Sequence, residues 1–125
     1  AYRRQRQMCI RDRFKALHDA GVRLRMGSDA PVAPLDPWMA ISAAVFGTES
    51  SDREPFQPEQ CLDARTALAA STAVGRDRPE PGDPADLVLL DRDPYAVSTP
   101  EEMRAMPVAA TMLAGRWTYS SLHGE

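Results

Sequence analysis

The sequence predicts an α/β fold, and three observations support that prediction. Residues 14–20 carry apolar side chains at helical spacing, and Gly21 follows as a natural helix end. Residues 22–26 then alternate apolar and polar side chains, which is typical of a strand. Three more short apolar runs predict further strands, the last two joined by a tight turn as a hairpin: residues 86–91, 108–113 and 116–119.

Helices are expected in the intervals between these strands. Asp36 can cap a helix that starts at Pro37, because proline suits the first helical position. Asp63 can cap a second helix over residues 64–71, which consists mostly of good helix formers. Residues 100–106 predict a third, short helix with acidic side chains in its first turn.

The composition is that of an ordinary globular chain. The 125 residues are 43% hydrophobic and 26% charged, a balance that excludes a disordered chain. The two cysteines, Cys9 and Cys61, form no zinc-binding pattern and are expected to be free thiols in a reducing cytoplasm. No apolar run approaches the roughly 18–20 residues that span a bilayer, so we expect no membrane partner.

The basic charge is concentrated at the start of the chain. Residues 1–15 carry six basic side chains and one acidic side chain, although the whole chain has a net charge of −3. Such a segment could be an arm that binds nucleic acid. No aromatic ladder or nucleic-acid motif accompanies it, so we favour a solvated or foreign segment and expect no nucleic-acid partner.

Several segments together resemble one enzyme family. Residues 21–32 read GVRLRMGSDAPV, residues 36–38 read DPW, residues 81–91 read PGDPADLVLLD, and residues 111–119 read TMLAGRWTY. In this order and spacing they resemble the amidohydrolase-3 branch of the metal-dependent amidohydrolase superfamily. The resemblance covers residues 14–119 and leaves out the first 13 residues, of which residues 7–13, QMCIRDR, look like a translated sequencing-adapter string.

The resemblance implies a fold and a division of the chain. Its members have a (β/α)8 barrel, which needs about 250 residues, and a small β-sandwich built from both chain ends. We therefore expect the C-terminal portion of such an enzyme, with residues 14–75 as the end of the barrel and residues 76–125 as C-terminal strands of the β-domain. Residues 1–13 would be a non-matching, artefactual head.

Asp29 is the candidate catalytic and metal-binding residue that the resemblance implies. The aspartate that ends the family's last barrel strand binds the metal and handles the proton of the attacking water. Three neighbours are candidates for the substrate pocket, namely Ser28, Pro31 and Val32. The alternatives are that Asp29 only braces an Asp-Ala-Pro turn and that Ser28 is a turn serine.

The histidine ligands of the family have no counterpart in this sequence. His18 and His123 are the only histidines, and neither occupies a family motif position. The expected cofactor is a divalent metal, Zn²⁺, in the full-length parent, with no tight binding to this chain.

The implied function is hydrolysis of carbon–nitrogen bonds in a small-molecule amide that is not a peptide. The chain by itself is expected to be inactive, because one carboxylate cannot hold a catalytic metal. The alternative function is a small α+β interaction or structural module without catalysis.

Overall fold

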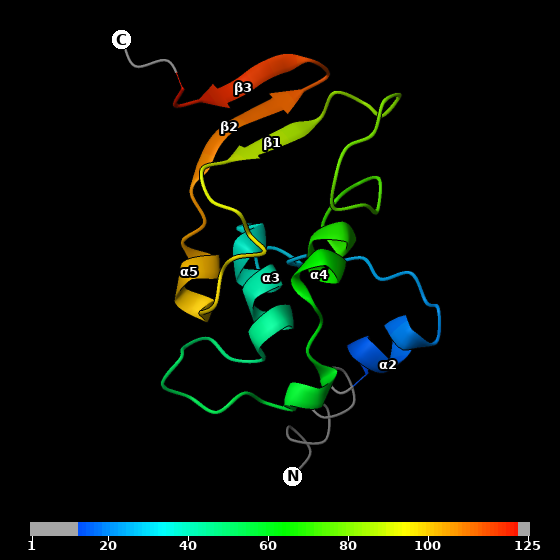
Figure 1. Ribbon diagram of the computed structural model, residues 1–125, viewed down its shortest axis with the longest axis vertical. Helices are drawn as coiled ribbons and strands as arrows, with labels where there is room; N and C mark the ends of the chain where they lie inside the picture. Colours follow the sequence, from blue (N-terminus) through cyan, green and yellow to red (C-terminus); the bar gives the residue numbers. More distant parts are fainter. Residues whose placement is uncertain (1–12, 123–125) are drawn as a thin grey trace.

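The computed structural model describes residues 13–122 and places a small sheet at one end of a cluster of helices (Figure 1). The elements in chain order are α2 (Phe14–Asp19), α3 (Pro37–Phe46), the 3₁₀ helix η1 (Pro58–Gln60), α4 (Ala64–Ala70), β1 (Leu87–Leu90), α5 (Pro100–Arg104), β2 (Val108–Leu113) and β3 (Arg116–Ser120). Helices α3, α4 and α5 lie together in the middle of the view, and α2 lies apart from the sheet.

The helix starts follow the capping signals in the sequence. The Asp36 carboxylate accepts a hydrogen bond of 2.9 Å from the Trp38 N–H at the start of α3. The Asp63 carboxylate accepts one of 2.8 Å from the Thr66 N–H at the start of α4. Each bond satisfies a backbone donor that has no partner inside its helix, so both predicted caps are confirmed.

The three strands form one antiparallel sheet in the order β1-β2-β3. Ala114 and Gly115 connect β2 to β3, with φ values of 50° and 75°. Two successive positive φ values are the requirement of a type I′ turn, whose twist matches that of the strands. The predicted hairpin is confirmed, whereas the second sheet of a composite sandwich stays a proposal.

The core lies between α3, α4 and α5. Met103 of α5 is fully buried and packs with Trp38 and Ile41 of α3 and with Ala67 of α4. Ser42, also buried, donates a hydrogen bond of 3.1 Å to the Pro100 carbonyl. The core therefore joins residues from both sides of the 76–84 linker. The division of the chain at residue 75 stays a prediction.

The predicted strand at residues 22–26 is absent, and this expectation was wrong for the described structure. Residues 22–29 have no regular secondary structure. Strands form by pairing, and within residues 13–122 no strand lies beside this segment to complete a ladder. The alternation still has a consequence, because Leu24 and Met26 pack against the core.

The linker between the helices and the sheet is fastened by a polar contact. The Asp77 carboxylate accepts hydrogen bonds from the Tyr95 hydroxyl and from the Arg65 guanidinium, the latter at 2.6 Å. The Arg65 guanidinium also lies over the Tyr95 ring, 4.9 Å from its centroid. Since Arg65 belongs to α4, these contacts hold the start of α4 against the segment that follows β1.

Candidate functional site

Asp29 lies in the irregular segment that leads from α2 to α3. It is exposed, and its φ of 52° is in the left-handed region. Aspartate tolerates this region better than most residues, because its short polar side chain can bond locally. The carbonyl of Asp29 accepts a hydrogen bond of 2.9 Å from the Val32 N–H. The Asp29 carboxylate therefore stands on a turn that faces solvent.

The three candidate pocket residues lie on the same turn as Asp29. Ser28 is half-buried, Pro31 is exposed and follows a cis peptide bond, and Val32 is 82% exposed. None of these side chains lines the cavity beside α4 or the smaller cavity between α3 and Arg104. Their role in binding substrate stays a proposal. Trp38 of α3 is buried in the core at 8% exposure, so it packs rather than reaching a ligand.

The residues just before Asp29 are fastened to the end of α4. The Arg25 guanidinium donates hydrogen bonds of 2.6 Å and 2.8 Å to the carbonyls of Thr72 and Ala73. The Met26 N–H donates one of 2.9 Å to the Ala70 carbonyl. These bonds fix the path of the chain three and four residues before the candidate carboxylate.

The described residues do not make a metal centre. Within residues 13–122, no three His, Cys, Asp or Glu side chains gather as a metal-binding group. His18 is exposed on α2, and His123 lies outside the described residues. Asp29 therefore belongs to no group of three or more potential metal ligands in this part of the chain.

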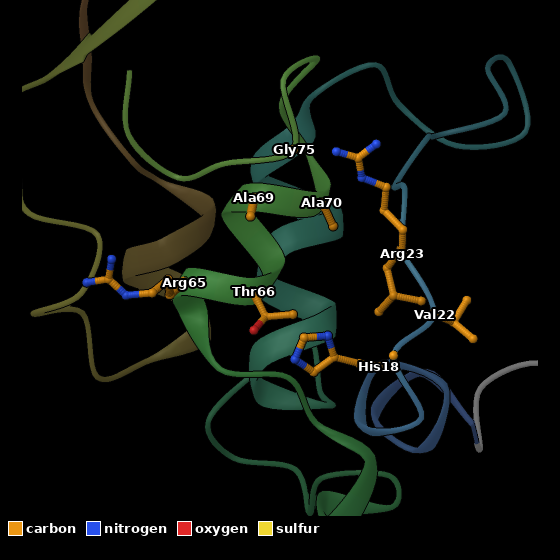
Figure 2. Close-up of a pocket in the computed structure, with 10 residues that line it drawn as sticks. His18, Val22, Arg23, Arg65, Thr66, Ala69, Ala70 and Gly75 are labelled. Carbon is orange, nitrogen blue, oxygen red and sulfur yellow. The ribbon is translucent and has the colours of Figure 1, made fainter. Parts of the chain in front are cut away.

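A cavity of about 320 Å³ lies between α4 and residues 21–24 (Figure 2). Val22, Leu24 and the alanines of α4 form apolar walls, and His18 and Arg23 stand at its edge. Arg65 extends from α4 away from this space, toward Asp77. The cavity contains no carboxylate and does not include Asp29, so it is separate from the candidate site.

Three groups whose pKa values are shifted also lie away from Asp29. The hydrogen bond from the Tyr95 hydroxyl lowers the pKa of Asp77. Burial, together with that bond, raises the pKa of Tyr95. Burial and the nearby Glu59 carboxylate raise the pKa of the Cys61 thiol. Groups of this kind can mark functional sites, but Asp77 and Tyr95 belong to the contact that joins α4 to the segment after β1.

Two of the contacts described above have no signal in the sequence. Arg25 bonds to carbonyls 47 and 48 residues away, and Tyr95 bonds to Asp77, 18 residues before it. The two arginines in residues 22–26 can be seen in the sequence. No local sequence pattern predicts that the Arg25 guanidinium binds the carbonyls of Thr72 and Ala73.

Comparison with known proteins adds a family. The model of the Amidohydrolase family matches residues 2–119. The matched range begins inside the proposed head, so the head as a separate unit stays a prediction, and residues 1–12 lie outside the described residues. No solved structure matches the chain significantly.

Two curated proteins are similar over most of the chain. YtcJ of Bacillus subtilis (strain 168), which its name describes as an amidohydrolase, is 26% identical over 117 residues, or 85% of this chain and 22% of that protein. The N-substituted formamide deformylase of Arthrobacter pascens is 32% identical over 114 residues, or 84% of this chain and 21% of that enzyme. The chain thus spans about a fifth of the length of these relatives.

Proposed function

Because the chain belongs to the amidohydrolase family, we propose that it supplies the catalytic carboxylate, Asp29, of an enzyme that hydrolyses carbon–nitrogen bonds in small, non-peptide amides. The observation that carries the proposal is the setting of Asp29. Its carboxylate is exposed on a left-handed turn, directly after a segment whose path is fixed by α4. Residues held in sparsely populated φ regions cluster at functional sites.

The role of Asp29 follows from the chemistry of a carboxylate. Within hydrogen-bond reach of the attacking water, it accepts the proton that the water loses as it adds to the amide carbon. It then returns that proton to the leaving nitrogen, which departs as a neutral amine. Ser28, Pro31 and Val32 flank this carboxylate on the same turn, and we assign them to the wall of the substrate pocket.

The described residues do not fit a complete metal centre, because within residues 13–122 no three His, Cys, Asp or Glu side chains gather around Asp29 or elsewhere. The family is generally metal-dependent, and we propose Zn²⁺ as the metal of the parent enzyme. Asp29 would contribute one ligand, and the other ligands would come from outside the described residues. A carboxylate alone does not hold a catalytic zinc ion, which takes three protein ligands as a rule.

The proposed parent is larger than this chain. A barrel of the proposed kind needs about 250 residues, whereas the described residues contain one three-stranded antiparallel sheet. We propose that residues 14–75 complete the end of the barrel, that residues 76–125 add strands to a β-domain, and that the chain alone is inactive. None of the helices in the described residues has the length and apolar character needed to cross a bilayer.

A chimeric enzyme tests this proposal. The segment of the Arthrobacter pascens deformylase that the chain matches is replaced by residues 14–119 of this chain, and hydrolysis of an N-substituted formamide is measured. We expect the chimera to bind zinc and to turn over substrate, and the isolated chain to do neither. A folded chimera that binds zinc but shows no turnover would contradict the proposal.

A further inference from the structure

The strongest polar anchor near the candidate site belongs to Arg25, to which the resemblance assigns no role. We propose that Arg25 is a positioning residue, which holds the Asp29 turn in place by clamping the preceding segment onto the end of α4. This inference rests on the function proposed for Asp29. It concerns how the carboxylate is placed and not which groups react.

The geometry of the clamp is specific. One nitrogen of the Arg25 guanidinium, Nη1, donates to both the Thr72 and the Ala73 carbonyl, at 2.6 Å and 2.8 Å. These carbonyls lie just beyond Ser71, the C-cap of α4, and the Thr72 carbonyl also accepts a hydrogen bond of 3.2 Å from the Gly75 N–H. A guanidinium that remains charged at all accessible pH values makes strong hydrogen bonds to such acceptors.

The other end of the clamp is rigid, because α4 is held along its length. Asp63 caps its start, and Arg65 in its first turn bonds to Asp77 at 2.6 Å. Ala67 and Ala70 are buried in the protein interior. A segment fastened to the end of α4 therefore takes its position from the core.

Without the clamp, the chain before Asp29 is held by one backbone hydrogen bond and by the packing of Leu24 and Met26 against the core. The Met26 N–H still bonds to the Ala70 carbonyl, and the Met26 side chain still packs against the core. Gly27 follows directly, and a Cβ placed there would meet no atom within 4 Å. Because this flexible residue has open space around it, the turn that carries Asp29 can shift once the segment loosens.

The neighbouring Arg23 offers a matched control. It lies on the same segment, its guanidinium is near Gly75, and no hydrogen bond or ion pair joins it to another described residue. Arg23→Met therefore removes the same charge and the same donors as Arg25→Met without removing a clamp.

The first measurement is hydrogen exchange of the Met26 amide by NMR in the full 125-residue chain. We expect Arg25→Met to speed its exchange by about tenfold or more, because hydrogen bonds from a charged donor are lost nearby. Arg23→Met should stay within about twofold of the unsubstituted chain, as surface substitutions usually do. Equal exchange in the two variants would overturn the proposal, and so would unprotected exchange in the unsubstituted chain.

The second measurement is steady-state turnover in the deformylase chimera. We expect Arg25→Met to lower kcat by roughly tenfold to a hundredfold with little change in KM, since a misplaced catalytic group costs rate rather than binding. Arg25→Lys should recover part of kcat, because an ammonium can donate to one of the two carbonyls. Unchanged kcat in Arg25→Met would overturn the positioning role.

The two measurements separate this inference from the proposed function. If the unsubstituted chimera folds but is inactive, the catalytic role of Asp29 is refuted, and the positioning role of Arg25 is refuted with it. The exchange rates of the Met26 amide would still show whether Arg25 holds the segment. An active chimera in which only Asp29→Asn loses rate would retain the catalytic carboxylate and exclude Arg25.

Discussion

Replacing Gly47 by alanine should destabilise the fold by more than the cost of placing alanine at a positive φ, because the added Cβ also meets close neighbours. Gly47 ends α3 with a φ of 66°, and its carbonyl accepts a hydrogen bond of 2.9 Å from the Phe56 N–H. An added Cβ would lie 2.9 Å from the Cys61 sulfur and 3.1 Å from the Phe56 carbonyl oxygen. The backbone oxygen cannot swing away, so the α3 end and the loop that follows must separate.

The magnitude follows from two contributions. Alanine in the left-handed region costs about 1 kcal/mol, and overpacking in a tight space adds about 1–3 kcal/mol. We therefore expect Gly47→Ala to lower the free energy of unfolding by about 2–4 kcal/mol, measured by urea denaturation with far-UV circular dichroism.

Gly115→Ala is the matched control for Gly47→Ala. Gly115 has a similar φ of 75°, but a Cβ there would meet only the Ala85 Cβ at 3.9 Å, an ordinary contact. It should cost only about 1 kcal/mol. Adding Cys61→Ala to Gly47→Ala should recover part of the loss, since one of the two close contacts disappears. Equal costs at Gly47 and Gly115 would refute the reasoning.

Three further predictions concern the core and its polar contacts. Met103→Ala removes a fully buried side chain and should cost about 2–5 kcal/mol in urea denaturation; a cost below about 1 kcal/mol would show that α5 does not pack in the core. Tyr95→Phe removes the hydroxyl that donates to Asp77 and should cost about 1 kcal/mol, whereas an unchanged denaturation midpoint would contradict that contact. Hydrogen bonds from the Thr66 N–H, the Tyr95 hydroxyl and the Ser51 N–H lower the pKa values of Asp63, Asp77 and Glu101 respectively. Because these carboxyl pKa values are lower in the folded than in the unfolded state, the ionised carboxylates stabilise the fold at a pH above their unfolded-state pKa values. This stabilisation is lost as the pH falls through their folded-state pKa values. The free energy of unfolding should thus decrease below about pH 4, and a flat profile from pH 5 to pH 2 would refute this.

Local chemistry made much of the fold predictable from the sequence. Asp36 and Asp63 each bond to a backbone N–H two or three residues ahead, so the signal and its partner lie in one short window. Ala114 and Gly115 likewise form their turn from within the hairpin itself. Such elements depend little on the rest of the molecule.

The failed prediction at residues 22–26 has a non-local cause. Alternation identifies the side chains that face the core, and Leu24 and Met26 do pack there. A strand also needs hydrogen bonds from a neighbour, and residues 13–122 provide none beside this segment. The periodicity could not supply the partner strand, and Val22 of the same apolar face is 45% exposed.

The candidate site, too, has one feature that the sequence predicted and one that only the structure shows. Asp29 was identified from the motif in which it lies, and the structure adds its exposure and its positive φ. The Arg25 clamp joins residues 47 and 48 positions apart, so it became visible only in three dimensions.

Whether Asp29 is a catalytic carboxylate can be decided from kcat of the deformylase chimera with Asp29→Asn. Asparagine also tolerates a φ of 52°, so the turn should keep its shape while the proton acceptor is lost. We expect kcat to fall by about a hundredfold or more, while the circular dichroism spectrum of the chimera stays unchanged. A folded Asp29→Asn chimera whose kcat stays close to that of the unsubstituted chimera would contradict it.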